Sequence, residues 1–267
     1  MAKATTMGPM KIKESASYRV FKVFNAIILT LISVAMLYPF LYLIAQSFSS
    51  TQAIVAGQVG LIPKDFNIST YKYVITDGKF IPYYGNTIVY SIIGTVCALL
   101  FSALLAYPLS KAELYGGKAI NKFIIFTMYF GGGMIPGYLV VEQLGLGNSI
   151  WCMIFPCLIG PFNIILIKNY IEDLPLAIEE SAKIDGANDM VILFKIILPM
   201  STPIIATVAL FVAVGNWNSY WMAMLHINKP NLYPLQLLLR NMLLNTTNSM
   251  TGVKAAIIAQ EKSVYDL

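Results

Sequence analysis

The sequence has little charge and a single histidine. Charged residues make up 12% of its 267 residues, about half the share of a soluble globular protein. The histidine, His226, falls in an expected loop with no partner at a catalytic spacing, so we expect it to be solvated. The chain also lacks a Gly-x-x-x-x-Gly-Lys-Ser/Thr loop, which excludes nucleotide binding through that motif. We therefore expect no catalytic residues, metal site or cofactor on this chain.

Cysteine is also scarce. The three cysteines lie in apolar stretches without paired spacing, which predicts buried free thiols: Cys97, Cys152 and Cys157. Hydrophobic side chains, in contrast, make up 57% of the chain and give it a mean hydropathy of +0.69. This composition predicts an all-α, polytopic membrane helical bundle.

Five apolar segments are long enough to cross a hydrocarbon core of about 30 Å as helices. They cover residues 24–45, 86–110, 123–141, 149–167 and 194–214. The third contains Gly131-Gly132-Gly133 and Pro136, which indicate one broken helix or two half-helices. The first is too long for a cleaved signal peptide, so we expect it to stay in the membrane after a polar segment, residues 1–23.

The basic residues predict the orientation of these segments. With the N-terminus inside, the cytoplasmic stretches hold eleven basic residues: five in 1–23, three in 111–122 and three in 168–195. The outward stretches hold five: Lys64, Lys72, Lys79, Lys229 and Arg240. This asymmetry follows the positive-inside rule and predicts a multi-pass protein of the cell membrane with a cytoplasmic N-terminus. The net charge of +5 therefore reflects topology and not nucleic-acid binding.

One charged stretch interrupts the apolar sequence, and the topology places it in the cytoplasm. It holds six of the thirteen acids: Glu172, Asp173, Glu179, Glu180, Asp185 and Asp189. Pro175 suits a first helical turn, Gly186 a left-handed helix end, and Asn188 or Asp189 the cap of a second helix. The pattern predicts an elbow, residues 172–195, whose second helix enters the bilayer. An ordinary cytoplasmic loop is the alternative on pattern alone.

The elbow resembles the EAA motif of ATP-binding-cassette importer permeases. The matching residues are Glu180-Ser181-Ala182, Asp185-Gly186-Ala187 and Leu198-Pro199, with Ser181 in place of the motif's alanine. The resemblance implies a permease fold of the MetI type, with ATP bound by a partner chain. It also implies which residues couple to a groove of that ATPase: Glu179, Glu180, Ser181, Ala182, Asp185, Gly186 and Ala187.

A second candidate site is aromatic and ends the fifth segment on the outer side. Flat rings stack on the apolar face of a sugar, and amides bond its hydroxyls. The candidates for the path of a polar neutral solute are Asn216, Trp217, Asn218 and Tyr220. An interfacial aromatic belt explains the same residues equally well. The Trp-Asn pair, together with residues 130–136, 232–236 and 240–241, resembles the oligosaccharide branch of the carbohydrate permeases.

The resemblance covers residues 20–257 and implies several partners. These are a sister permease subunit, two ATPase subunits, an extracytoplasmic solute-binding protein and the lipid bilayer. By analogy, ATP closes the ATPase dimer, which moves the elbow and rocks the helices. The alternatives are a secondary carrier or passive channel for a polar neutral solute, and a membrane structural protein. The apolar segments hold almost no acid, base or histidine, which argues against an ion-driven carrier.

The end of the chain departs from the family pattern. We assign residues 24–259 to the transmembrane permease domain and residues 260–267 to a tail. The apolar stretch 253–259 is too short to span a bilayer. We therefore expect five spans, with the family's last helix missing.

Overall fold

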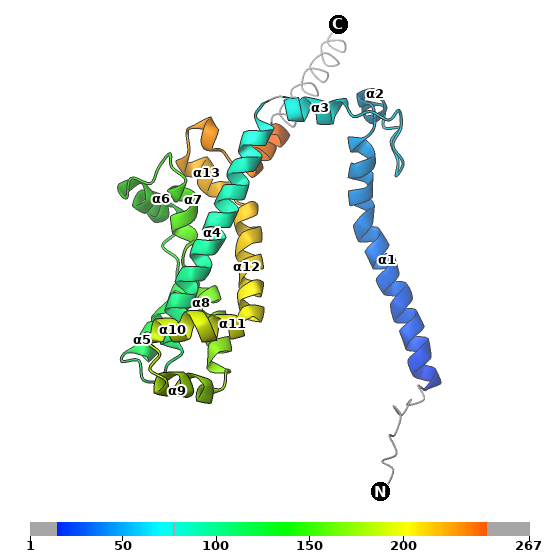
Figure 1. Cartoon of the computed structure of the whole chain (residues 1–267). Helices are drawn as coiled ribbons and strands as arrows, with labels where there is room; N and C mark the ends of the chain where they lie inside the picture. Colours follow the sequence, from blue (N-terminus) through cyan, green and yellow to red (C-terminus); the bar gives the residue numbers. More distant parts are fainter. Residues whose placement is uncertain (1–14, 77, 245–267) are drawn as a thin grey trace. The chain divides into compact units, whose positions relative to one another are not determined.

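The computed structural model describes residues 15–76 and 78–244, which form helices and connecting loops without any strand. The expected all-α class is confirmed. The chain divides into two units, Met1–Asp77 and Gly78–Leu267 (Figure 1), and each is described by itself. The expected tail lies outside the described residues, and the expected domain boundaries at residues 23 and 259 stay predictions.

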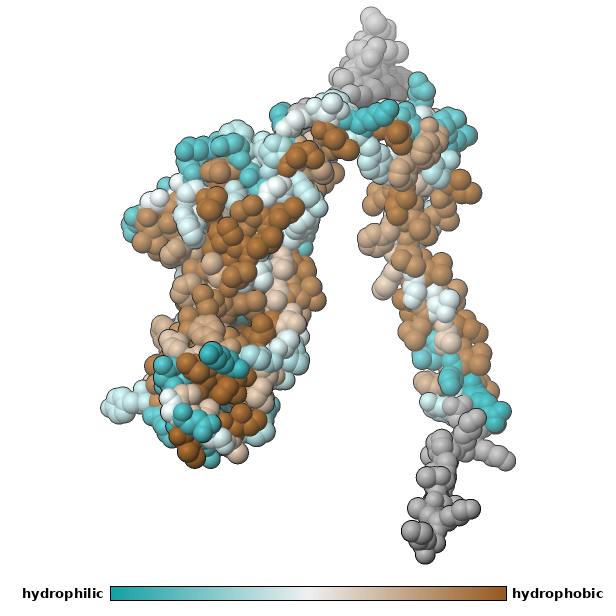
Figure 2. Space-filling view, viewed as in Figure 1, coloured by the Kyte–Doolittle hydropathy of each residue, from teal (hydrophilic) through white to brown (hydrophobic). Residues whose placement is uncertain are grey.

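The first unit consists mainly of α1 (Ala16–Ser47). Its 32 residues correspond to about 48 Å of helix, enough to cross a bilayer. The Ser15 hydroxyl caps its first turn by accepting a hydrogen bond from the Tyr18 amide at 3.2 Å. Apolar side chains cover most of its surface (Figure 2), as expected for a helix that faces lipid or other membrane helices. Two short helices follow, α2 (Thr51–Val55) and α3 (Ser69–Thr76).

The second unit is built around α4 (Phe80–Leu109). α8 (Pro161–Glu172) and α12 (Thr202–Trp217) pack against it. The contact with α12 is close because α4 has no side chain at one point: a Cβ atom on Gly94 would lie 2.7 Å from Nδ2 of Asn216. Small residues at such crossings allow membrane helices to approach each other closely.

Three of the expected spans are bent helix pairs. α5 (Gly117–Tyr129) and α6 (Met134–Gln143) meet at 115° across the glycine run, where Gly133 has a φ of +86°. α7 (Trp151–Ile154) and η1 (Phe155–Cys157) meet α8 at 49°. Among the described residues, α1 and α4 are long and apolar enough to span alone, and the count reaches five when each bent pair is one span. The glycine run therefore breaks the third expected span, as its sequence indicated.

The third bent pair contains the expected fifth span, residues 194–214. Its first arm consists of α10 (Asp189–Ile192), the π-helix η2 (Leu193–Ile197) and α11 (Leu198–Met200). This arm meets α12 at 83°, so the segment is a bent helix pair and not one straight helix, and the entry of the elbow's second helix into the bilayer stays a prediction. Pro199 and Pro203 have no amide hydrogen, and the helix is interrupted between them at Ser201.

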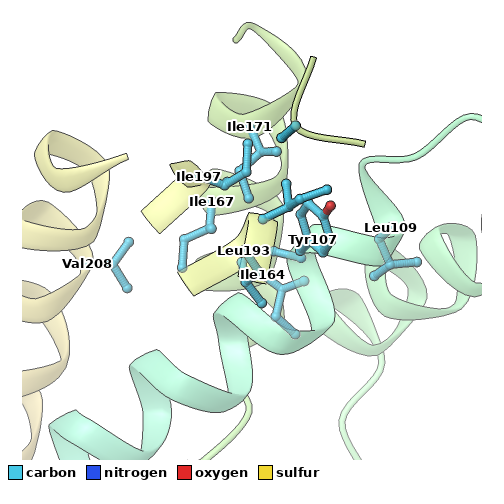
Figure 3. Packing of buried hydrophobic residues seen from close by; sticks show 11 residues of the cluster. Tyr107, Leu109, Ile164, Ile167, Ile171, Leu193, Ile197 and Val208 are labelled. Atoms are coloured by element: carbon cyan, nitrogen blue, oxygen red, sulfur yellow. The ribbon is translucent and has the colours of Figure 1, made fainter. Parts of the chain in front are cut away.

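Two clusters of buried side chains stabilise the second unit. The elbow cluster (Figure 3) joins α4, α8 and α12 to the elbow, including α9 (Leu176–Ile184). It consists of Ala106, Tyr107, Leu109, Ile164, Ile167, Ile171, Ala182, Ile192, Leu193, Ile197 and Val208. The far cluster consists of Tyr90, Val141, Cys152, Met153, Ala223, Ile227 and Leu237. The three cysteines are free, as predicted, but only Cys152 is buried, and Cys157 is exposed.

The chain after α12 is held against the beginning of α4. It contains α13 (Trp221–His226), η3 (Pro230–Leu232) and a helix over Leu235–Leu244. Four hydrogen bonds make the connection: Asn86 Nδ2 to the carbonyls of Asn231 (2.7 Å) and Tyr233 (3.1 Å), the Tyr90 hydroxyl to the Leu232 carbonyl (2.8 Å), and the Leu235 amide to Thr87 Oγ1 (2.8 Å). α4 therefore contacts the segment after α12 near its own beginning and the elbow near its own end.

Candidate functional site

The elbow has the turn that its sequence predicts. Gly186 has a φ of +82°, which a residue with a Cβ adopts only with strain. Its amide donates to the Lys183 carbonyl and the Ala187 amide to the Ala182 carbonyl, both at 3.0 Å, which is a Schellman helix end. The Asn188 side chain then caps α10 by accepting from the Val191 amide at 2.9 Å. The two helices of the elbow are therefore joined by a short turn with defined geometry.

The candidate coupling residues face two directions. Glu179 and Ala182 are buried against the rest of the unit, and Ala187 is partly buried. Four others are exposed: Glu180, Ser181, Asp185 and Gly186. The exposed surface of the elbow also carries large apolar side chains: Leu176, Ile184 and Met190. We call the exposed set of four polar or small residues and these three apolar ones the outer elbow face.

Glu179 is the buried charge of α9, with a residue exposure of 6%. Its carboxylate accepts hydrogen bonds from the Tyr107 hydroxyl at 3.1 Å and from the Lys111 ammonium, and Lys183 Nζ lies 3.4 Å from it. Burial by itself raises the pKa of a carboxyl group, but Lys111, Tyr107 and Lys183 together outweigh it and lower the pKa of Glu179. Glu179 is therefore held as a carboxylate.

The four aromatic-site candidates contact three different partners. The Trp217 ring lies edge-on to Tyr84 of α4, with centroids 5.7 Å apart, and the Asn216 amide lies against Gly94. Asn218 donates to the carbonyl of its own helix at Val214 (2.9 Å). Tyr220 lies beneath the guanidinium of Arg240, 5.6 Å from the ring centroid. The structure therefore brings Asn216 and Trp217 to α4, whereas Asn218 and Tyr220 lie apart from that contact.

The sequence matches a known family of membrane transport proteins. A family model described as "Binding-protein-dependent transport system inner membrane component" matches residues 12–259. This chain belongs to that family. The permease is 41% identical to Protein LplC of Bacillus subtilis over 253 residues, which are 90% of this chain and 86% of LplC. It is also 41% identical to the polygalacturonan/rhamnogalacturonan transport system permease protein YtcP of Bacillus subtilis, over 80% of this chain and 74% of YtcP.

A solved structure shares the fold of the permease. It is a bacterial ABC transporter involved in the import of the acidic polysaccharide alginate, with a TM-score of 0.82 and 37% identity. The match covers 88% of this chain and 84% of that chain. The MetI-type permease fold and a location in the membrane are therefore established. The secondary carrier, the passive channel and the structural protein are no longer needed as explanations.

Sequence reasoning was wrong about His226 of the permease. The histidine is the last residue of α13 and has an exposure of only 3%. Its ring stacks on Tyr138 at 4.9 Å, and its Nδ1 lies 3.4 Å from Oε1 of Glu142. Both partners lie on α6, more than eighty positions earlier in the sequence. The one available signal was Glu142 itself, an acid four residues after a tyrosine in an otherwise apolar helix.

Proposed function

We propose that this permease transmits ATP hydrolysis by two ATPase subunits to a translocation path that it shares with a sister permease. Its N-terminus lies in the cytoplasm, and an extracytoplasmic solute-binding protein delivers the solute. ATP binds the ATPase subunits and not this chain. The observation that carries the proposal is the outer elbow face, where apolar and carboxylate side chains lie together around the turn at Gly186.

The composition of the outer elbow face fits a protein groove. Ile184 has an exposure of 85%, and such apolar side chains are stabilised when a partner covers them. Glu180 and Asp185 are exposed and make no ion pair within the described part of the chain. An amphipathic helix with both features fits an apolar groove flanked by basic residues. We assign this contact to Glu180, Ser181, Asp185, Gly186 and Ala187, with Glu179 and Ala182 holding α9 from behind.

Copurification tests the contact. The complex is expressed with a tagged permease carrying Glu180→Ala and Ile184→Ser, and the ATPase that copurifies from detergent is quantified. We expect a loss of at least tenfold, because the variant removes one charge and one apolar contact from the face. Asp173→Ala, which removes an exposed acid outside α9, is the matched control. Undiminished ATPase recovery with the double variant would refute the assignment.

The solute that fits best is an acidic oligosaccharide, which replaces the neutral solute expected from the aromatic residues alone. Two relatives transport acidic polysaccharides by name: polygalacturonan/rhamnogalacturonan for YtcP and alginate for the solved importer. In this chain the Arg240 guanidinium lies over the ring of Tyr220, three residues after Trp217. A guanidinium held over a ring keeps the donors along its edge, and these match the two oxygens of a uronate carboxylate.

Uptake by reconstituted complexes separates the two solute classes. We expect uronate oligosaccharides to be transported in preference to neutral glucose oligosaccharides of equal length. Arg240→Gln should reduce uronate uptake at least fivefold, and Arg240→Lys should retain part of it because the positive charge remains. Equal uptake of both classes by the unmodified complex would contradict the acidic assignment.

A further inference from the structure

The buried side of the elbow contains a polar contact that lies apart from the outer elbow face. We propose that Glu179, Lys111 and Tyr107 form a joint that transmits displacement of the elbow to α4, so that Glu179 and Lys111 are positioning residues for the coupling of ATP hydrolysis to transport. The inference rests on the proposed function, because it assumes that an ATPase moves α9. It differs from that function in assigning a task to residues that face away from the ATPase.

The joint connects two elements that are far apart in the sequence. Glu179 lies in the middle of α9, Tyr107 in the last turn of α4, and Lys111 just after the Ser110 cap of α4. The Lys111 ammonium also lies 4.4 Å from the centroid of the Tyr107 ring, so the two donors support each other. One carboxylate is thereby held by two groups that move with the end of α4.

Little else attaches α9 to α4. Glu179 and Ala182 are the buried residues of α9, and Ala182 contributes only a methyl group to the elbow cluster. Apolar contact is not directional, so a methyl group does not fix the rotation of a helix about its axis. Hydrogen bonds from a hydroxyl and an ammonium to one carboxylate are directional and charge-assisted. The orientation of α9 relative to α4 therefore depends on Glu179.

The space beside the contact supports the same conclusion. A groove of about 370 Å³ lies next to it, and side chains of both α4 and the elbow line the groove, among them Leu104, Pro108 and Met190. The elbow is therefore not packed continuously against α4 on this side. A force on α9 reaches the end of α4 through the carboxylate and its two donors more directly than through packed side chains.

Paired charge variants in the reconstituted complex test the joint. Three quantities are measured: the ATPase that copurifies, the rate of ATP hydrolysis, and the solute transported per ATP hydrolysed. Glu179→Gln and Lys111→Met each break the ion pair without a large change in volume. We expect both to retain at least half of the bound ATPase and of its hydrolysis, while transport per ATP falls at least tenfold. The exchange Lys111→Glu with Glu179→Lys restores the ion pair and should recover at least a third of the unmodified ratio.

Lys183→Met is the matched control. It removes another positive charge beside Glu179, but Lys183 lies on α9 itself and makes no connection to α4. We expect its transport per ATP to stay within twofold of the unmodified complex. The proposal is overturned if both single variants keep their transport per ATP, if Lys183→Met loses as much as they do, or if the charge exchange recovers nothing.

The results also separate the joint from the proposed function. Loss of ATPase binding in parallel with transport in Glu179→Gln would show that the pair merely supports the fold of α9, and this outcome refutes the joint alone. An unmodified complex that recruits no ATPase would refute the proposed function, and the joint with it. Tight recruitment, intact hydrolysis and lost transport in the single variants support both.

Discussion

The contact between α4 and α12 gives a sharp test of the packing. A Cβ atom on Gly94 would lie 2.7 Å from Nδ2 and 3.3 Å from Cγ of Asn216, well inside the optimal separation of about 3.5–4.0 Å between non-bonded carbon atoms. Relieving such an overlap in a packed site costs about 1–3 kcal/mol. Replacing glycine by alanine in a helix gains about 1 kcal/mol from helix propensity. Gly94→Ala should therefore change the free energy of unfolding by about 0–2 kcal/mol in the destabilising direction.

A glycine elsewhere on α4 provides the control. No atom lies within 4 Å of a Cβ built on Gly85, so Gly85→Ala gains the propensity without the overlap. The two variants should differ by about 1–3 kcal/mol, or about 2–4 °C of melting temperature for each kcal/mol. The three atoms nearest to that Cβ all belong to the Asn216 amide, so Gly94→Ala should cost nothing when it is combined with Asn216→Ala. Thermal unfolding in detergent measures five proteins: the unmodified permease, Gly94→Ala, Gly85→Ala, Asn216→Ala and the combination of Gly94→Ala with Asn216→Ala. Equal melting temperatures for Gly94→Ala and Gly85→Ala would refute the close contact.

Three further predictions concern the elbow and the aromatic site. Gly186→Val places a β-branched residue at a φ of +82° and should reduce copurified ATPase and transport severalfold while the protein still inserts in membranes; membrane fractionation and uptake measure both effects. The lowered pKa of Glu179 means that its stabilisation is present above the ordinary glutamate pKa of about 4.3 and is lost as the pH falls through the lower folded-state value. The stability difference between the permease and Glu179→Gln should therefore shrink on acidification from pH 7 to pH 3. Trp217→Ala removes an aromatic pair with Tyr84, worth about 0.5–1.5 kcal/mol beyond its buried area, and should weaken uptake without weakening ATPase binding; equal loss of both would mark Trp217 as structural.

The sequence was sufficient for those features that depend on neighbouring residues. The turn at Gly186 and the cap at Asn188 follow from local backbone preferences, and the structure confirms both. The break of the third span also follows from its glycine run. These features need no information about the rest of the chain.

Features that depend on distant partners were missed. Glu179 and Glu180 were both expected to couple to the ATPase, but only contact with Tyr107 and Lys111 decides which of the two is buried. His226 was expected to be solvated because its partners belong to α6. Pro199 and Pro203 interrupt the helix of the fifth span, but the 83° angle depends on how α10 to α11 pack in the elbow cluster.

The unbroken length of α4 has a geometric consequence. The helix contributes to the elbow cluster near one end and to the far cluster nearer the other, and no proline interrupts it between Tyr83 and Tyr107. Its 30 residues correspond to about 45 Å, so a tilt of about 10° about one end displaces the other end by about 8 Å. Such a displacement is comparable to the width of a sugar ring with its hydration. Under the proposed function, a small rotation imposed at the elbow would be enlarged along the length of α4, and the far cluster, with His226 and the segment bound by Asn86 beside it, would move the most.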